Sequence, residues 1–576
     1  MSRAAIRRAR SERFRHARQV NGSTARDLVA DALTAGVLAA SDAEGWGDAA
    51  RAVPVEVERP SNPAHGDYAT SVAMRLARPL KRPPLALAKA IADRVPQREA
   101  IAAVEVAPPG FVNVRLETTW LARQVEAILA QDTAFGRSDA LRGQRIQVEF
   151  ISANPTGPMT VANARGGPLG DVLANVLAFC GADITREYYV NDAGGRVEVL
   201  GESVAVRYRQ LGGDTSIPFP EDGYPADYIT DVARRIREEE GSKYDGLPFE
   251  EQARIFTRKA QGWFVEGAKQ TAERLGVHFD SWYFESELVS SGYFQGTLDA
   301  LRAGGHLEDR DGALWLRSRE LGEDIDSVVV RSNGLPTYLG IDIAYHRLCL
   351  VERAFDRKID IWGANTHGHL RKMRTALAAL GLADRWSVVL YQYVRFLHEG
   401  VLQKMGKRLA QFLLLDDVID AVGVDVARWF FLQTSADRTL DFDFELAVQQ
   451  SNENPVYYVQ YAHARISSIF RTAADRRVSA EGADCTLLTD GAELDLVRLC
   501  LRFPELVEEV RDRYNVHLLT VYALELAGAF HAFYKGNRVV GDDLARSKAR
   551  LRLVEVVGLT LRQVLGLLGV SAPESM

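Results

Sequence analysis

Cysteine, long apolar runs and surplus positive charge are all scarce in this sequence of 576 residues. No two of its four cysteines form a CxxC pair, which argues against a zinc ribbon or a dithiol redox site and favours a reducing, cytoplasmic location; they are Cys180, Cys349, Cys485 and Cys500. No apolar run reaches the roughly 18 residues of a membrane-spanning helix, so we expect no membrane partner. The net charge is −7, and any contact with a nucleic acid must therefore come from local basic faces.

The length corresponds to about three to four domains at roughly 150 residues each. Apolar residues make up 47% and charged residues 26% of the chain, as in ordinary globular proteins. The first 20 residues, MSRAAIRRARSERFRHARQV, are rich in arginine and lack the apolar segment of a secretory signal. We expect a basic tail without ordered structure over residues 1–24, and a transit peptide or an RNA-contacting arm remain open alternatives.

The next segment has the pattern of a small α/β module that ends near residue 140. Residues 27–40 and 82–95 show helical periodicity, and Val53–Pro60 alternates in the manner of a strand. A second alternating run, Val104–Leu116, is broken by a Pro-Pro-Gly turn.

A strand–loop–helix–strand pattern follows this module. Arg145–Ser152 and Asp183–Val190 read as strands. Between them lies an amphipathic helix whose apolar positions recur at helical spacing, Leu169, Val172, Leu173, Val176, Leu177 and Cys180. Such a βαβ unit is the start of a parallel, Rossmann-type nucleotide-binding sheet, so the predicted fold class is α/β.

The rest of the chain divides into a mixed part and a helical part. Residues of about 200–300 are mainly helical and charged, and we interpret them as an insertion. Three further runs read as buried strands, Ser327–Ser332, Lys358–Ala364 and Ser387–Val394. From about residue 450 onward the pattern predicts one helix after another.

The loop between the first strand and the helix of the βαβ unit reads NPTGPMTVANARGG, and it is suited to bind a phosphate. A helix N-terminus offers free N–H groups and partial positive charge to an anion. Pro155 and Pro158 stiffen the loop, and Gly157 allows close approach of the backbone. Alone, such a loop is weakly specific because many α/β proteins contain one.

The wider sequence is much more specific. SANPTGPMTVANARG followed by REYYVNDAGGR resembles the arginyl-tRNA synthetase family, which belongs to the class I aminoacyl-tRNA synthetases. The resemblance continues over HGDYAT, PPGFVNVRL, PEDGYPADYITDVAR, VRSNGLPTYLGIDIAYH and SNENPVYYVQYAHARI, and it runs from about residue 25 to the C-terminus.

The resemblance implies a domain plan and a reaction. The plan has an additional N-terminal, tRNA-contacting domain (25–140), a Rossmann catalytic domain with its insertion (141–400), a KMSK-like loop and stem-contact region (401–450) and an α-helical anticodon-binding bundle (451–576). The reaction joins L-arginine to tRNA(Arg) with ATP and Mg²⁺ as substrate. We expect a cytoplasmic monomer with no tightly bound cofactor and no structural metal.

The ATP-side segments depart from the family pattern. Where the family reads HIGH, this chain has Thr160-Val161-Ala162-Asn163, and neither polar residue can carry the positive charge of a histidine beside the phosphates. Where the family reads KMSK, a KMGK segment keeps both phosphate-binding lysines, Lys404 and Lys407, around Met405. A third segment, WGANTHG, provides Gly363 and His367 as further ATP contacts but has lost a carboxylate and an imidazole.

The segments that the resemblance assigns to arginine and tRNA binding match the family pattern more closely. Asn154, Tyr338 and Asp342 occupy family positions that line the arginine pocket, and a guanidinium needs a carboxylate and planar acceptors. Tyr338 and Asp342 are four residues apart, so a helix would place them on one face. Aromatic and basic side chains suited to unpaired anticodon bases gather in one segment, namely Tyr457, Tyr461 and Arg465.

Three functional interpretations stay open at this point. The first is an arginine–tRNA ligase that is impaired at adenylate formation. The second is a pseudo-synthetase that binds arginine or tRNA in a regulatory or auxiliary role. The third is a paralogue that uses the same pocket in a biosynthetic pathway.

Overall fold

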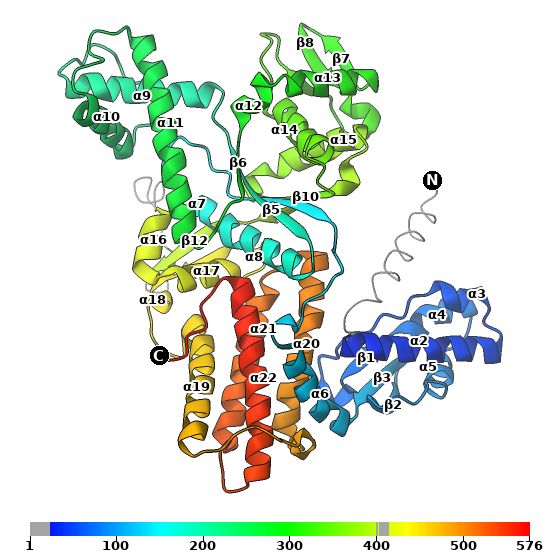
Figure 1. Ribbon diagram of the computed structural model, residues 1–576. Coiled ribbons are helices and arrows are strands. Elements are labelled where there is room, and N and C mark those ends of the chain that lie inside the picture. Colours follow the sequence, from blue (N-terminus) through cyan, green and yellow to red (C-terminus); the bar gives the residue numbers. More distant parts are fainter. Residues whose placement is uncertain (1–23, 399–400, 403–413) are drawn as a thin grey trace.

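The computed structural model describes residues 24–398, 401–402 and 414–576. A central parallel sheet carries two lobes on one side and a helical bundle on the other, with the N-terminal module beside the bundle (Figure 1). The expected basic tail and most of the expected KMSK-like loop lie outside the described residues. Among the helices that are described, none combines the length and the apolarity needed to cross a membrane.

The N-terminal module is α/β, as the sequence predicts. Its antiparallel sheet has the order β1-β3-β2, and its elements are α2 (Ala25–Glu44), α3 (Asp48–Ala52), β1 (Tyr68–Thr70), α4 (Val72–Leu80), α5 (Pro84–Ala92), β2 (Ile101–Ala107), β3 (Phe111–Leu116) and α6 (Thr118–Gln131). The two helices are confirmed, and the Pro-Pro-Gly turn joins β2 to β3 in an antiparallel hairpin. The strand expected over Val53–Pro60 is wrong, because only Glu58 pairs there, in an isolated bridge with Ala69. Pro54 and Pro60 have no N–H to donate to a ladder.

The central sheet is parallel throughout, with the order β11-β10-β4-β5-β6. Its strands are β4 (Arg145–Glu149), β5 (Asp183–Val190), β6 (Ser281–Phe284), β10 (Arg357–Gly363) and β11 (Trp386–Tyr391). Helix α8 (Gly166–Phe179) connects β4 to β5, which confirms the βαβ unit. The strand order reverses between β4 and β10, and ligands of open α/β sheets bind at the carboxyl ends of strands at such a point.

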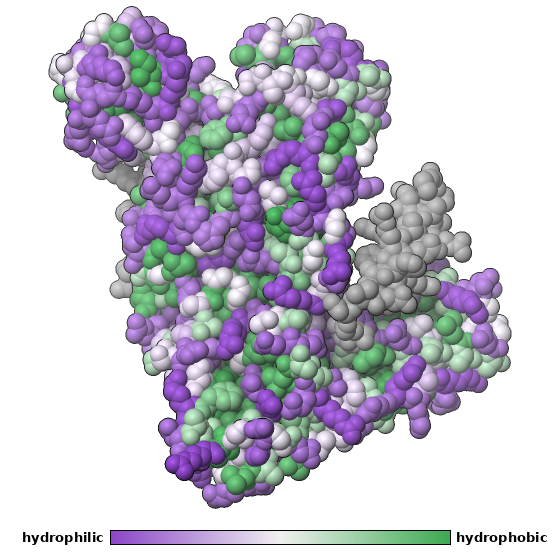
Figure 2. Space-filling view, in the orientation of Figure 1, coloured by the Kyte–Doolittle hydropathy of each residue, from purple (hydrophilic) through white to green (hydrophobic). Residues whose placement is uncertain are grey.

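Two lobes rise from the carboxyl edge of the sheet, and Figure 2 shows a deep notch between them. The first is helical: α9 (Gly195–Leu211), α10 (Asp227–Glu240) and α11 (Phe249–Arg274). The second contains α12 (Glu285–Ser290), α13 (Tyr293–Ala303), β7 (Leu307–Arg310), β8 (Ala313–Leu316), β9 (Ser327–Val330), α14 (Tyr338–Arg347) and α15 (His367–Ala379).

Two expectations for these lobes need correction. The helical insertion ends at Arg274 and not near residue 300, because β6 already belongs to the central sheet. The strand expected over Ser327–Ser332 exists as β9, but it pairs antiparallel with β8 in a separate sheet. A short apolar run does not reveal its pairing partner, since the partner is set by the tertiary fold.

The remaining elements lead into the bundle. A short helix, α7 (Val161–Ala164), precedes α8, and the elements after the sheet are β12 (Val394–His398), β13 (Val401–Leu402), α16 (Leu415–Val422), α17 (Val424–Leu432), β14 (Leu440–Asp443) and α18 (Phe444–Ala447). The bundle consists of α19 (Pro455–Asp475), α20 (Gly491–Arg513), α21 (Leu518–Gly536) and α22 (Leu544–Leu568). The helical C-terminal part is confirmed.

A buried guanidinium joins the catalytic sheet to the bundle. Arg428 on α17 is fully buried and donates to Asp171 on α8 at 2.6 Å. It also donates to three backbone carbonyls, those of Leu275, Gly276 and Leu568, at 3.0–3.1 Å. Gly569 closes α22 at φ +65°, and a side chain there would collide with the guanidinium. Arg428 therefore fixes the end of α22 against α8.

Replacing this guanidinium should destabilise the protein far more than replacing an exposed one. Arg428→Met leaves three buried carbonyls and part of the Asp171 carboxylate without a donor, which costs about 3–5 kcal/mol. Arg513→Met, which removes an exposed pair with Glu509, should cost less than about 1 kcal/mol. Urea denaturation followed by circular dichroism measures both, and equal losses would contradict the structural role of Arg428.

Candidate active site

The chain turns sharply after β4, at the point where the sheet order reverses. Ile151 and Ser152 adopt left-handed φ values of 65° and 43°, which are unfavourable for residues with side chains. The Ser152 hydroxyl holds the turn: it donates to Glu149 at 3.0 Å and accepts the backbone N–H of Tyr189 at 3.1 Å. The turn directs the following loop to the carboxyl edge of the sheet.

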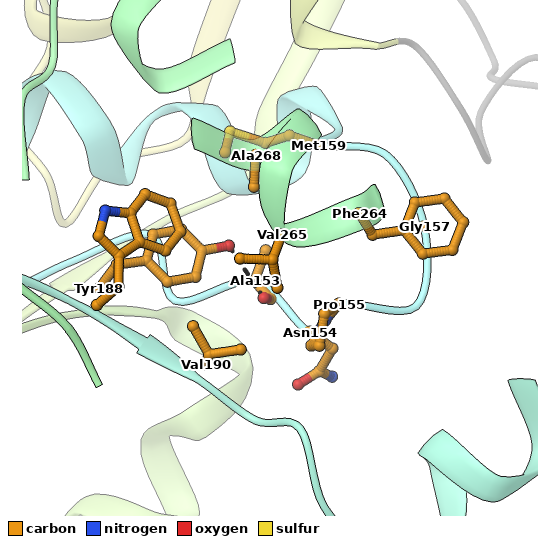
Figure 3. A pocket seen from close by; sticks show the side chains of 11 residues that line it. Ala153, Asn154, Pro155, Gly157, Met159, Tyr188, Val190, Phe264, Val265 and Ala268 are labelled. Atoms are coloured by element: carbon orange, nitrogen blue, oxygen red, sulfur yellow. Dashed lines mark hydrogen bonds between the residues drawn. The ribbon is translucent and has the colours of Figure 1, made fainter. Parts of the chain in front are cut away.

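This loop carries Asn154 and is pinned by two tyrosines from other elements. Tyr188 on β5 donates to the carbonyl of Ala153, and Tyr228 on α10 donates to that of Thr156, both at 3.0 Å. Figure 3 shows the Asn154 amide directed away from the apolar side chains behind the loop. The cavity among those side chains has a volume of about 10 Å³, room for about one water molecule. Asn154 thus borders this cavity, with its amide directed away from it.

Thr160 and Asn163 face each other at the start of α7. Thr160 precedes the helix, and its hydroxyl donates to the Asn163 side-chain oxygen at 3.1 Å. Both side chains are partly exposed and neutral, so they bring hydrogen-bonding groups but no positive charge to this position.

The other segments expected to bind ATP lie around the starts of α7 and α8. The Tyr391 ring at the end of β11 lies beside Gly166 at the start of α8 and beside Gly363 at the end of β10. Leu414 forms an isolated bridge with Thr160, so the chain that follows the KMSK-like segment returns to α7. His367 begins α15 directly after this edge. The other expected phosphate contacts, Lys404, Met405 and Lys407, lie outside the described residues.

A cluster of carboxylates surrounds Tyr189 at the end of β5. The Tyr189 hydroxyl donates to Glu285 at 3.0 Å. Its pKa is held well above the usual value by burial and then by three carboxylates, those of Glu285, Asp342 and Glu149. Burial raises the pKa of Glu285 to about 7, against the effect of the Tyr189 hydrogen bond, and the charges of Asp342 and Asp192 raise it further. Several negative charges gathered at one edge create a site for a cation.

Asp342 projects from α14 into this region and already holds one partner. His369 on α15 approaches the Asp342 carboxylate at 2.6 Å through Nε2, which leaves the second carboxylate oxygen for a further donor. Tyr338 begins the same helix and is 55% exposed. The helical spacing expected for Tyr338 and Asp342 is thus confirmed.

Sequence reasoning missed three members of this cluster, namely Glu149, Tyr189 and Glu285. Each lies at or directly after the last residues of a parallel strand, β4, β5 or β6. That position was the available signal, because the ends of parallel strands meet at one edge. His369 is a further member, and its pairing with Asp342, 27 residues away in the chain, is visible only in the fold.

The aromatic segment of the bundle forms one continuous surface. Tyr457 and Tyr461 on α19 stack with ring centroids 6.1 Å apart, and Tyr461 also stacks on His531 of α21 at 5.9 Å. Arg465 lies over the rings of Tyr461 and Tyr534 at 4.6 and 5.1 Å. All of these side chains remain at least partly exposed. Planar rings and a cation on one face are the groups on which unpaired bases stack.

Comparison with known sequences decides the family. Three family descriptions match in succession: "Arginyl tRNA synthetase N terminal domain" over residues 24–116, "tRNA synthetases class I (R), catalytic domain" over 124–451 and "DALR anticodon binding domain" over 459–576. The chain belongs to the arginyl-tRNA synthetase family. A protein of Carboxydothermus hydrogenoformans named arginine–tRNA ligase is 42% identical over 97% of this chain and 99% of its own length. One of Geobacillus kaustophilus with the same name is 42% identical over 91% and 94%.

Solved structures agree with this assignment. A putative arginyl-tRNA synthetase of Campylobacter jejuni is 30% identical, covers 80% of this chain and all of its own, and has a TM-score of 0.73. The Thermus thermophilus arginyl-tRNA synthetase, 23% identical, shares the fold over 96% of this chain and all of its own with a TM-score of 0.74. The predicted family and the α/β fold of a class I synthetase are confirmed.

The raised pKa of Glu285 leads to a prediction about stability. The pKa of an unfolded glutamate is about 4.3, so folding favours the protonated form, and stability is lost as the pH rises from about 4 to about 7. Glu285→Gln should therefore stabilise the protein at pH 8 relative to pH 5 by on the order of 2–3 kcal/mol. Urea denaturation at both pH values measures the difference. An effect of the same size at both pH values would exclude a buried, ionising Glu285.

Proposed function

We propose that this protein is an arginine–tRNA ligase that uses the carboxylate cluster around Tyr189 to bind the arginine side chain. The cluster supports the proposal because it lies at the edge where class I synthetases build their site, next to the loop that carries Asn154. A guanidinium would offset the charges that Glu285 and Asp342 impose on each other. The naming of the relatives as arginine–tRNA ligases agrees with this choice of amino acid.

The proposed reaction has two steps. The arginine carboxylate attacks the α-phosphate of ATP, so that arginyl-adenylate forms and diphosphate leaves. The terminal ribose hydroxyl of tRNA(Arg) then attacks the arginyl carbonyl, and AMP leaves. We assign arginine binding to Asn154, Tyr338 and Asp342, ATP binding to Met405, Gly363 and His367, and stabilisation of the phosphates to Lys404 and Lys407.

We further propose that adenylate formation is slower than in a synthetase with two histidines at the start of α7. The Thr160 hydroxyl donates to the Asn163 side-chain oxygen, and neither residue provides a charge beside the phosphates. Loss of one preorganised donor to a transition state costs about 10²–10³ in rate in other enzymes. Mg²⁺ would enter with ATP, and we expect the protein to act as a monomer in the cytoplasm.

Restoring the family residues tests this assignment directly. The variant Thr160→His/Ala162→Gly/Asn163→His should increase arginine-dependent diphosphate–ATP exchange, measured with saturating tRNA(Arg), by about 10²-fold or more. The control Asn163→Ala removes the hydrogen bond with Thr160 and adds no charge, so its rate should stay within about fivefold of wild type.

The same assay separates the ligase from the binding-protein alternative. Exchange and charging by the unmodified protein support a ligase. Saturable binding of arginine and tRNA with no exchange, also in the restored variant, would overturn the proposal and favour a pseudo-synthetase. The relatives reported above carry the name of the ligase and provide no support for that alternative.

The aromatic surface of the bundle is our proposed anticodon contact, through Tyr457, Tyr461 and Arg465. Tyr461→Ala removes a ring that stacks on two neighbours and should weaken tRNA(Arg) binding by about 1–3 kcal/mol, with the arginine KM unchanged. Filter binding and charging kinetics measure the two effects. As a control, Tyr208→Phe alters a tyrosine in the helical lobe and should leave tRNA affinity unaffected.

A further inference from the structure

The ammonium group of Lys358 is buried in the centre of the molecule, between the two halves of the proposed arginine site. Lys358 is the second residue of β10 and is 0% exposed. Its Nζ donates to the Glu149 carboxylate at 2.5 Å and to that of Asp360 at still closer range, and it lies 4.7 Å from the Tyr345 ring centroid. A buried cation persists only where such partners offset its desolvation.

One branch of hydrogen bonds leads from Lys358 to the Asn154 loop. Glu149 accepts from Lys358 with one carboxylate oxygen and from the Ser152 hydroxyl with the other. Ser152 is one of the two residues in the left-handed turn, and its hydroxyl also accepts from the Tyr189 backbone. The conformation of the turn therefore depends on a carboxylate that Lys358 orients.

A second branch leads from Lys358 to the helix that carries Tyr338 and Asp342. Asp360 accepts from Lys358 and from Trp386 Nε1 at 2.6 Å, and it lies 2.8 Å from His346 Nε2. The other ring nitrogen of His346 lies 2.7 Å from the backbone carbonyl of Asp342. A carbonyl only accepts, so this nitrogen donates. The Asp342 turn of α14 is thereby tied to the same ammonium group.

The charges of this network support each other. Burial alone would lower the pKa of Lys358, but the carboxylates of Asp360 and Glu149 raise it above its usual value, so the ammonium keeps its charge. Burial raises the pKa of Glu149 to about 7, and the charge of Lys358 opposes that rise. Without Lys358 the pKa of Glu149 would rise further, so Glu149 would take up a proton and lose one acceptor of the network.

We propose that Lys358 is a positioning residue that holds the Asn154 loop and the Asp342 helix at the spacing that arginine requires. The inference rests on the proposed function, because it takes these two elements as the halves of the arginine site. Lys358 does not touch the substrate, and its effect passes through Glu149 and Asp360. Small displacements of positioning elements reduce enzyme rates by up to about 10²-fold.

Lys358→Met, which keeps most of the length of the side chain and removes the charge, tests the proposal. The arginine Kd from isothermal titration calorimetry should rise by roughly 10- to 100-fold, whereas the ATP KM in the exchange assay should change by less than about threefold. Lys243→Met is the matched control, because Lys243 also pairs with a carboxylate, that of Glu240, but is 62% exposed. Its arginine Kd should equal that of wild type.

A second variant separates positioning from stability. Lys358→Met/Glu149→Gln/Asp360→Asn leaves no unpaired charge between β4 and β10, so its Tm should recover toward that of wild type, while its arginine Kd should stay raised. Recovery of both quantities, or an unchanged Kd in Lys358→Met, would overturn the positioning role. If the wild-type protein binds arginine but shows no diphosphate–ATP exchange, the proposed activity alone is overturned. Wild-type protein that binds no arginine would overturn both proposals.

Discussion

The pairing of β4 with β10 is the constraint on which the rest of this molecule depends. These two strands meet where the order of the sheet reverses, and they place Glu149 beside Asp360 in register. Two neighbouring carboxylates inside a sheet repel each other unless a cation lies between them, and Lys358 provides it. The site at the carboxyl edge is therefore built on a buried ion network and not on apolar packing alone.

The proposed arginine and ATP sides of the site differ in the charges that their side chains carry. On the proposed arginine side, Glu285, Asp342 and Glu149 act together on Tyr189, and burial, with the charges of Asp342 and Asp192, raises the pKa of Glu285. On the ATP side, Thr160 and Asn163 form a neutral hydrogen-bonded pair. The negative charge of the carboxylates thus favours a cationic substrate. Thr160 and Asn163 carry no charge, so phosphates would have to be stabilised by other groups.

Contacts far from the site fix the elements that carry it relative to one another. Arg428 ties the end of the bundle to α8, and the fully buried Arg165, directly before α8, donates to five backbone carbonyls between Gln392 and Arg438. Both guanidinium groups satisfy carbonyls that the ends of helices and loops leave unpaired. Helix α8, whose start borders the proposed ATP side, is thereby held directly before its first residue and again at Asp171.

The sequence by itself determined the family, the α/β class, the βαβ unit and the helical C-terminal part, because these depend on local periodicity and on motifs of contiguous residues. It also indicated Asn154, Asp342 and the tyrosines of α19, whose assigned roles remain proposals. Only the tertiary structure decided that β9 lies in a separate sheet, that Val53–Pro60 forms no strand and that Glu149, Glu285 and His369 join the site. Lys358 shows the reason most clearly: its partner Glu149 is 209 residues away in the chain, and no local pattern encodes a contact that only the pairing of two distant strands creates.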